Sequence, residues 1–219
     1  ELEYPDGTDC KDIRLKTVLR APGGQKVAER ETALSPYDEG VFEQDFVVDR
    51  PLLWDCEHPN LYWADTEVYY QGRLSDTYQT TFGIRTIEVV PEKGFLLNGK
   101  RLVFHGTCNH HDLGPLGTAV NMQAIRYRLK MLKDMGSNAY RTSHNMPSPE
   151  LVQACNEMGM LLMVETFDEW KAKKMANGYN KYYDEWVERD LVNVVRHYRN
   201  DPSVVMWCIG NEMDGPWQV

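Results

Sequence analysis

A chain of 219 residues with 42% apolar and 26% charged residues has the composition of an ordinary globular protein, which excludes disordered and fibrous classes. Its net charge of -9, without any long run of Lys or Arg, argues against a nucleic acid or an anionic membrane as partner and favours a neutral one. Apolar runs such as residues 158–164 are too short to span a bilayer, so we expect no membrane insertion, and the sequence indicates no compartment.

Up to about residue 91 apolar and polar residues alternate with a period of two, the pattern of half-buried strands. We expect strands at residues 13–15, 41–48, 66–71 and 78–90, with turns at 5–7, 22–24, 35–36 and 71–72. The pattern predicts an antiparallel, immunoglobulin-like β-sandwich. About five or six strands can be counted where such a domain has about seven, so at least one strand is expected to precede Glu1.

From Gly94 onward the pattern changes to alternating strands and helices. Strands are predicted at residues 101–105, 138–141, 160–165 and 204–209. The first helix carries the stripe Met122, Ile125, Leu129 and Leu132 and is closed by Gly136; the second begins at Ser148-Pro149-Glu150 and ends at Gly159; the third carries Val187, Leu191, Val194 and Tyr198. The expected order is therefore βαβαβαβ.

Apolar strands between amphipathic helices predict a parallel sheet, either open or part of a barrel. Polar residues follow each predicted strand, as in barrels that collect their chemistry at one face, and no Gly-rich nucleotide turn is present. Residues 94–219 make up about half of the ~250 that a full barrel needs. We therefore predict a multidomain β plus α/β fold: a sandwich over residues 1–91, and the N-terminal half of a TIM (β/α)8 barrel, truncated after its fourth strand, over residues 92–219.

The run Gly210-Asn211-Glu212 directly follows the apolar strand predicted at residues 204–209. Glycoside hydrolysis needs two carboxyl groups, one of which protonates the leaving oxygen. Glu212 is the candidate acid, and Asn211 could bind a sugar hydroxyl next to the reacting carbon. Alone, an Asn-Glu pair is more often an ordinary surface loop. The strand before it and the polar ends of the other strands favour the catalytic interpretation.

Four polar residues after the first two barrel strands allow several roles: His110, His111, Asp112 and His144. They could bind a metal, contact sugar hydroxyls or make structural hydrogen bonds. No HExxH or similar spacing occurs, so no metal site is predicted. Arg141 is interpreted as a positioning residue for the acid, as a partner of a buried carboxylate such as Glu165, or as both.

Aromatic rings are frequent near the strand ends, and rings can stack on the apolar face of a sugar. Most of them are expected in the core. Trp170 and Trp217 are the candidates for ligand contact because they follow strand ends.

The 5 cysteines are odd in number and never form a CxxC pair, which argues against a zinc site or a disulfide framework. Cys108, Cys155 and Cys208 lie in or beside apolar segments, so buried thiols are predicted. A redox role is the alternative.

Ordered motifs along nearly all of the chain make it similar to one known family. Pro51-Leu52-Leu53-Trp54, His58-Pro59-Asn60-Leu61-Tyr62 and Phe82-Gly83-Ile84-Arg85 resemble the closing strands of an immunoglobulin-like domain. Phe95-Leu96-Leu97-Asn98-Gly99-Lys100, Gly106-Thr107-Cys108-Asn109-His110-His111-Asp112, Arg141-Thr142-Ser143-His144-Asn145 and Trp207-Cys208-Ile209-Gly210-Asn211-Glu212 resemble the barrel signatures that follow it. The chain resembles the central part of a glycoside hydrolase family 2 enzyme, the family of β-galactosidases, β-glucuronidases and β-mannosidases.

This resemblance implies a retaining mechanism on a β-linked saccharide or glycoside, with Glu212 as general acid/base and a nucleophilic glutamate on a later strand that this sequence lacks. It implies that the sugar subsite is lined by His110, Arg141, His144 and Asn211, with Asp168 and Trp170 as further candidates. The loops most resemble β-galactosidase-like members. A β-glucuronidase, a β-mannosidase or a noncatalytic carbohydrate-binding fragment are the alternatives.

Two departures from the family pattern affect specificity and metal use. Val164-Glu165 stands where many members have Asp-Glu, which puts glucuronide specificity in doubt. Glu169 matches a magnesium-binding glutamate of some members, but Lys171 stands where histidine is expected, so no magnesium and no other cofactor is predicted.

A half barrel leaves its last strand unpaired. The isolated chain is therefore expected to be inactive, and stable only with the remainder of the parent enzyme or as a homo-oligomer.

Overall fold

The computed structural model describes residues 2–3, 8–34 and 41–213, and the chain divides into two compact units. The first unit comprises Glu1–Leu53 and Asn60–Ile84, and the second comprises Trp54–Pro59 and Arg85–Val219. The turns predicted at residues 5–7 and 35–36 lie outside the described residues. The predicted domain boundary at residue 91 stays a prediction.

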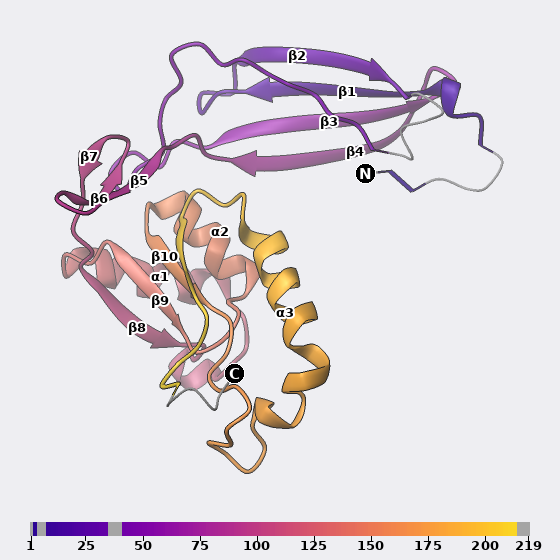
Figure 1. Ribbon diagram of the computed structural model, residues 1–219. Coiled ribbons are helices and arrows are strands. Elements are labelled where there is room, and N and C mark those ends of the chain that lie inside the picture. The colour runs from indigo at the N-terminus through magenta and orange to yellow at the C-terminus, as the bar shows by residue number, and fades with distance from the viewer. Residues whose placement is uncertain (1, 4–7, 35–40, 214–219) are drawn as a thin grey trace. The chain divides into compact units, whose positions relative to one another are not determined.

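One antiparallel sheet, in the order β2-β1-β3-β4, forms the described framework of the first unit (Figure 1). After the 3-10 helix η1 (Cys10–Asp12) come β1 (Ile13–Arg20), β2 (Lys26–Ala33), β3 (Tyr62–Tyr70) and β4 (Arg73–Phe82). Gln71 and Gly72 both have positive φ and form the two-residue turn between β3 and β4, which suits the twist of a hairpin. The strand-rich N-terminal half is confirmed.

The strand predicted at residues 41–48 is wrong, because this described segment joins no strand ladder. Its residues alternate between exposed and half-buried. Gln44 Nε2 donates to the Leu15 carbonyl at 3.3 Å and to Thr32 Oγ1 at 3.0 Å, so the segment lies against β1 and β2. Alternation of polar and apolar residues indicates only that one face of a segment is buried. Side-chain contacts can bury that face without main-chain pairing.

Two further strand predictions fail between residues 78 and 105. The strand predicted at 78–90 is divided into β4 and β5 (Ile87–Val90). In the second unit β5 pairs with β6 (Gly94–Leu97), which in turn pairs with β7 (Lys100–Arg101). Asn98-Gly99 forms a two-residue turn that pairs Leu97 with Lys100. This hairpin takes up Arg101, so the first barrel strand is β8 (Gly106–His110) and not residues 101–105.

The second unit contains a parallel sheet in the order β11-β10-β9-β8. The strands β8, β9 (Ala139–Ser143), β10 (Leu161–Glu165) and β11 (Val204–Cys208) alternate with α1 (Met122–Asp134), α2 (Pro149–Met158) and α3 (Tyr183–Tyr198), and the 3-10 helices η2 (Gly114–Leu116) and η3 (Tyr179–Lys181) lie in the connections. The predicted βαβαβαβ order is confirmed. Because the strands are parallel, all their carboxyl ends meet at one edge.

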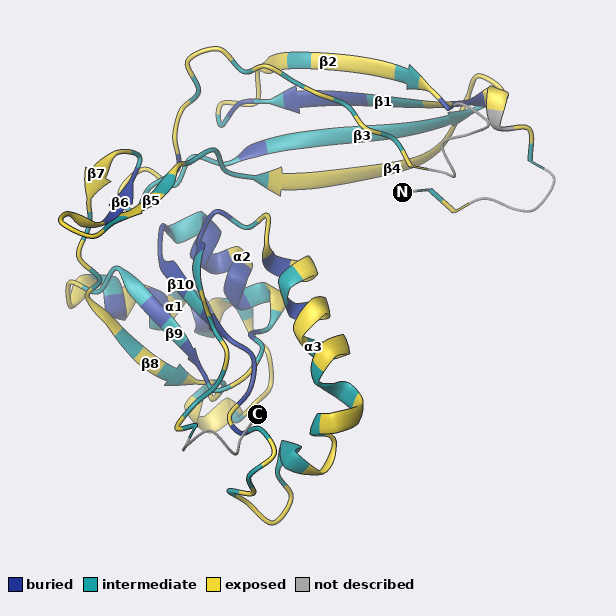
Figure 2. Cartoon of the chain, viewed as in Figure 1, coloured by how far each residue is buried: buried dark blue, intermediate teal, exposed yellow. Residues whose placement is uncertain are grey.

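The hydrophobic core of the second unit lies between this sheet and the helices. It includes Leu129 of α1, Cys155 of α2 and Val164 of β10, all without exposed area. Figure 2 shows much of α2 and β10 in the dark blue of buried residues. The predicted α1 stripe is buried except for the half-buried Met122. The predicted α3 stripe is only partly buried, since Val194 is buried but Leu191 is 37% exposed. Only the C-terminal half of α3 packs on the core. Among the described residues, no helix combines the length and apolarity needed to cross a membrane.

Local capping sets the lengths of α1 and α2. Gly136 ends α1 with a φ of 91°, and the N–H of Ser137 reaches back to the Leu132 carbonyl at 2.9 Å, which closes a Schellman motif. Ser148 begins α2, its Oγ accepting the Leu151 N–H at 3.3 Å. These ends agree with the sequence prediction, and they fix where β9 and β10 begin.

The entry to β11 is held by side chains from elsewhere in the unit. Asn156 Oδ1 accepts from the backbone N–H of Ser203 at 3.2 Å and its hydroxyl at 2.6 Å, while Asn156 Nδ2 donates to Asp201 at 2.6 Å. Arg85 donates to two main-chain carbonyls at the start of β11, at 2.5 and 2.7 Å. These polar contacts hold the start of β11. The position of the loop that follows the strand therefore depends on them.

Gly159→Ala is expected to lower the free energy of unfolding more than Gly136→Ala. Both glycines have positive φ, where an L residue costs about 1–2 kcal/mol. Only at Gly159 would the new Cβ also meet backbone, 2.5 Å from the Cys56 carbonyl oxygen, whereas the space at Gly136 is open. Calorimetric unfolding of the two variants in the full-length polypeptide measures the difference. Equal losses would contradict this explanation.

Candidate active site

A buried carboxylate stands at the carboxyl end of β10. Glu165 has 0% exposure, and its Oε1 accepts from Arg141 Nη2 at 2.9 Å. Its Oε2 lies 3.0 Å from His144 Nδ1, which acts as donor because an ionised carboxylate only accepts. Its backbone N–H donates to Thr142 Oγ1 at 2.9 Å. The pairing of Arg141 with Glu165 is as the sequence predicted, and it compensates the cost of burying the charge.

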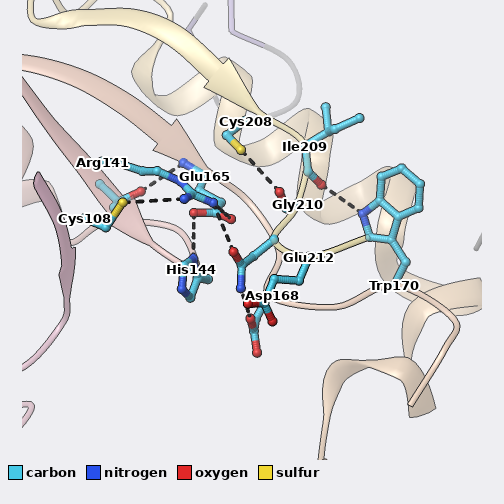
Figure 3. Close-up of polar contacts among 12 residues, drawn as sticks. Cys108, Arg141, His144, Glu165, Asp168, Trp170, Cys208, Ile209, Gly210 and Glu212 are labelled. Atoms are coloured by element: carbon cyan, nitrogen blue, oxygen red, sulfur yellow. Dashed lines mark hydrogen bonds and ion pairs between the residues drawn. The ribbon is translucent and has the colours of Figure 1, made fainter. Parts of the chain in front are cut away.

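Arg141 continues this network to the loop after β11 (Figure 3). Its Nη2 lies 3.3 Å from Asn211 Oδ1, and Asn211 Nδ2 donates to Asp168 Oδ1 at 3.1 Å. Burial opposes ionisation of Asp168, but hydrogen bonds from Asn211 and Lys174 hold the pKa of Asp168 below its ordinary value. Four predicted site residues, counting His144, are thus joined through Glu165 in one network across β9, β10 and β11.

Glu212 is the next residue in the chain after Asn211, and its side chain is far more exposed to solvent than the network. Its side chain is 78% exposed, and its carboxylate Oε2 lies 3.7 Å from Lys174 Nζ. The ring nitrogen of Trp170 is already used within the chain, because Nε1 donates to the Ile209 carbonyl at 2.9 Å. This hydrogen bond holds the end of the strand before Glu212. The other predicted aromatic candidate, Trp217, lies outside the described residues.

The loop after β10 contains two charged residues, Glu169 and Lys174, whose contacts the sequence did not predict. Glu169 is buried, and its two oxygens accept the backbone N–H groups of Lys174 at 2.7 Å and Asn180 at 3.0 Å. Lys174 then reaches the loop after β11. An acid five residues before a lysine is too common a pattern to have indicated this arrangement.

A cavity of about 540 Å³ borders the network. Its walls include His110, His144, Phe167, Asp168, Tyr179 and Asp190. The Tyr179 hydroxyl donates to Asp190 at 2.6 Å, and burial together with this carboxylate raises the pKa of Tyr179, so the phenol stays neutral. None of the described residues lining the cavity is Lys or Arg, so it suits a neutral, hydroxyl-rich ligand better than an anion.

The histidines at or directly after the ends of β8 and β9 make contacts within the chain. The rings of His110 and His144 meet edge to face at 5.0 Å. His111 Nε2 lies 3.1 Å from the Thr118 carbonyl, and Asp112 accepts the Gly114 N–H at 2.7 Å. Over the part of the chain that the structure describes, no group of three or more His, Cys, Asp or Glu residues is placed to hold a metal ion.

The predicted burial of three thiols is only partly right. Cys155 is fully buried, which raises the pKa of its thiol. Cys208 is half-buried, and Cys108 is exposed on the edge strand β8, whose residues alternate between exposed and half-buried. There its sulfur lies 3.5 Å from Arg141 Nη1.

Both parts of the chain match models of one protein family. Residues 87–216 match the model described as glycosyl hydrolases family 2, TIM barrel domain. Residues 3–85 match a second model, described as glycosyl hydrolases family 2. Together the two models account for the change of pattern near residue 91.

Individual relatives agree with these matches. The β-galactosidase BoGH2A of Bacteroides ovatus is 44% identical over 209 residues, which are 94% of this chain and 25% of the relative. A β-glucuronidase of Streptococcus agalactiae is 34% identical over 175 residues, 73% of this chain and 28% of that protein. The crystal structure of a β-glycosidase from Bacteroides vulgatus has a TM-score of 0.85 at 38% identity and covers 95% of this chain and 26% of that chain.

The chain thus spans about a quarter of the length of these relatives. The matches confirm the predicted fold class, an immunoglobulin-like β domain followed by the first part of a TIM barrel. This chain belongs to glycosyl hydrolase family 2.

Proposed function

We propose that this chain carries the acid/base part of the active site of a retaining exo-β-glycosidase that cleaves terminal β-galactosides, with Glu212 as general acid/base. One observation carries the proposal: Glu212 follows the carboxyl end of β11 directly after Asn211, whose amide is tied through Arg141 to the buried Glu165. The 44% identity to a relative named β-galactosidase supports the choice of sugar.

In the proposed first step, Glu212 gives its proton to the glycosidic oxygen while a second carboxylate attacks the anomeric carbon. The bond from that carbon to the oxygen breaks, the aglycone leaves as an alcohol, and Glu212 remains as a carboxylate. In the second step Glu212 takes a proton from the water that attacks the same carbon, which frees the sugar and the second carboxylate.

Asn211 is held ready to bind the sugar in both steps. Its Nδ2 has two hydrogens, one of which is used by Asp168, and the other can meet the hydroxyl next to the reacting carbon. Asp168 and His144 border the cavity and would accept from or donate to further hydroxyls, together with His110. Arg141 and Trp170 act mainly by holding the two loops.

We assign the nucleophile to a carboxylate beyond residues 1–219. A retaining pair stands only about 5–5.5 Å apart on either side of the bond, with both groups reaching the sugar. Glu165 has no exposed area and is committed to Arg141 and His144. Asp168 is committed to Asn211 and Lys174, which favours a role in binding.

A neutral sugar fits the described surface better than a uronic acid. Asp168 and Asp190 both border the cavity, and a sugar carboxylate there would meet like charges. A relative of 34% identity is named a β-glucuronidase, so glucuronides are the second candidate.

The full-length polypeptide is expected to release nitrophenol fastest from 4-nitrophenyl β-galactoside. The β-glucuronide and the β-mannoside should be cleaved at least ~10-fold more slowly by kcat/KM, because differential contacts to sugar substituents supply about 1–3 kcal/mol each. Initial rates on the three substrates check this. A preference for the glucuronide would replace the galactoside assignment.

Glu212→Gln is expected to lower kcat/KM on the preferred substrate by about 10²- to 10⁴-fold, since the amide cannot transfer the proton. Glu188→Gln is the matched control, because Glu188 is an exposed glutamate of α3 and should leave the rate unchanged. Full activity of the Glu212 variant would refute the role given to this residue.

Purified residues 1–219 are expected to give no turnover on the substrate that the full-length polypeptide cleaves, because double displacement needs both carboxylates. The rival function, a noncatalytic carbohydrate-binding fragment, predicts instead that the full-length polypeptide is also inactive. Parallel assays of the two polypeptides separate these outcomes. Hydrolysis by residues 1–219 alone would place the nucleophile within this chain.

A further inference from the structure

The side chain of Lys174 lies between the loop after β10 and the loop after β11. Its Nζ donates to the carbonyl of Asn211 at 2.6 Å and to the carbonyl of Asp168 at 2.7 Å. It also lies 3.3 Å from Asp168 Oδ1 and 3.7 Å from Glu212 Oε2. We propose that Lys174 is a positioning residue for Glu212, which fixes the backbone next to the acid and sets a positive charge beside its carboxylate.

The backbone of Lys174 is hydrogen-bonded to a buried side chain of the same loop. Its backbone N–H is bound by the buried Glu169, which also binds the N–H of Asn180. The lysine side chain is only 24% exposed, in contrast to the neighbouring Lys173. A side chain that is anchored at its backbone and partly withdrawn from water loses little further freedom when it makes its contacts.

The hydrogen bonds of Lys174 and its ion pair with Glu212 have different roles. An ammonium has three N–H donors, and the carbonyls of Asn211 and Asp168 with Asp168 Oδ1 account for all three. Glu212 at 3.7 Å is therefore within ion-pair distance and is not bound by a fixed hydrogen bond. The carboxyl of Glu212 stays free to transfer its proton, while the residue before it is pinned through its carbonyl.

The charge of Lys174 matters when the acid has given up its proton. This inference rests on the proposed function, in which the proton passes from Glu212 to the glycosidic oxygen and negative charge develops on the carboxylate. Among the ion pairs of the described residues, Lys174 is the only cationic partner of Glu212. A fixed charge at this place stabilises the developing carboxylate without rearrangement in the transition state.

A positioning role predicts a loss that depends on the leaving group, whereas a merely structural role does not. Phenol is a poor leaving group and needs the proton from Glu212, but 2,4-dinitrophenolate departs without one. Lys174→Met should therefore lower kcat/KM for the phenyl glycoside by about 10- to 100-fold and change that for the dinitrophenyl glycoside by less than ~3-fold. The ratio of the two values is independent of how much of the variant is correctly folded.

The experiment uses the full-length polypeptide with the phenyl and 2,4-dinitrophenyl glycosides of its preferred sugar. Glu212→Gln sets the leaving-group dependence for complete loss of the acid, and Lys174→Met should follow it with smaller amplitude. Lys174→Arg keeps a positive charge and should recover about tenfold of the loss on the phenyl glycoside. Lys173→Met removes the same charge from the exposed neighbour and should match the unmodified protein.

Equal losses on both glycosides in Lys174→Met, or no loss on either, would overturn the role of Lys174 while leaving that of Glu212 intact. Failure of Lys174→Arg to exceed Lys174→Met would overturn the contribution of the charge. If Glu212→Gln shows no dependence on the leaving group, the proposed function fails, and the role of Lys174 fails with it.

Discussion

The arrangement at the carboxyl ends of the strands depends on one buried ion pair, that of Glu165 with Arg141. A carboxylate without exposed area is stable only when its lone pairs are used, and here Arg141 and His144 each take one oxygen. Because both partners come from the end of β9, the pair fixes the end of β10 relative to its neighbour. The second contact of Arg141, to Asn211, extends the same constraint to β11.

The scaffold delivers these groups through contacts made far from the site. The caps of α1 and α2 decide where β9 and β10 begin, and Asn156 of α2 holds the turn that leads into β11. A five-residue strand then carries the chain from this turn toward Asn211. Small shifts of a reacting group cost large factors in rate, so buried polar contacts at the start of a strand affect chemistry at its end.

The two loops beyond the sheet show how positive charge is distributed around the proposed acid. Arg141 of β9 binds Glu165, whereas Lys174 binds Asn211 and Asp168 from the loop after β10. Asn211 is thus held by its side chain from one side and by its carbonyl from the other. The side chain of Glu212 remains 78% exposed, and the residue before it is hydrogen-bonded through both its side chain and its carbonyl.

The sequence by itself determined the alternation of strands and helices, the caps at Ser148 and Gly136, and the gathering of Arg141, His144, Asp168 and Asn211, because these follow from periodicity, from local hydrogen bonding and from the shared edge of a parallel sheet. It misplaced the first barrel strand, since the Asn98-Gly99 turn competes locally with an apolar run. Only the tertiary structure decided that residues 41–48 lie against a sheet without joining it, that Trp170 binds a carbonyl, and that Lys174 stands beside Glu212. Those outcomes depend on which distant backbone groups meet, and no pattern within one segment contains that information.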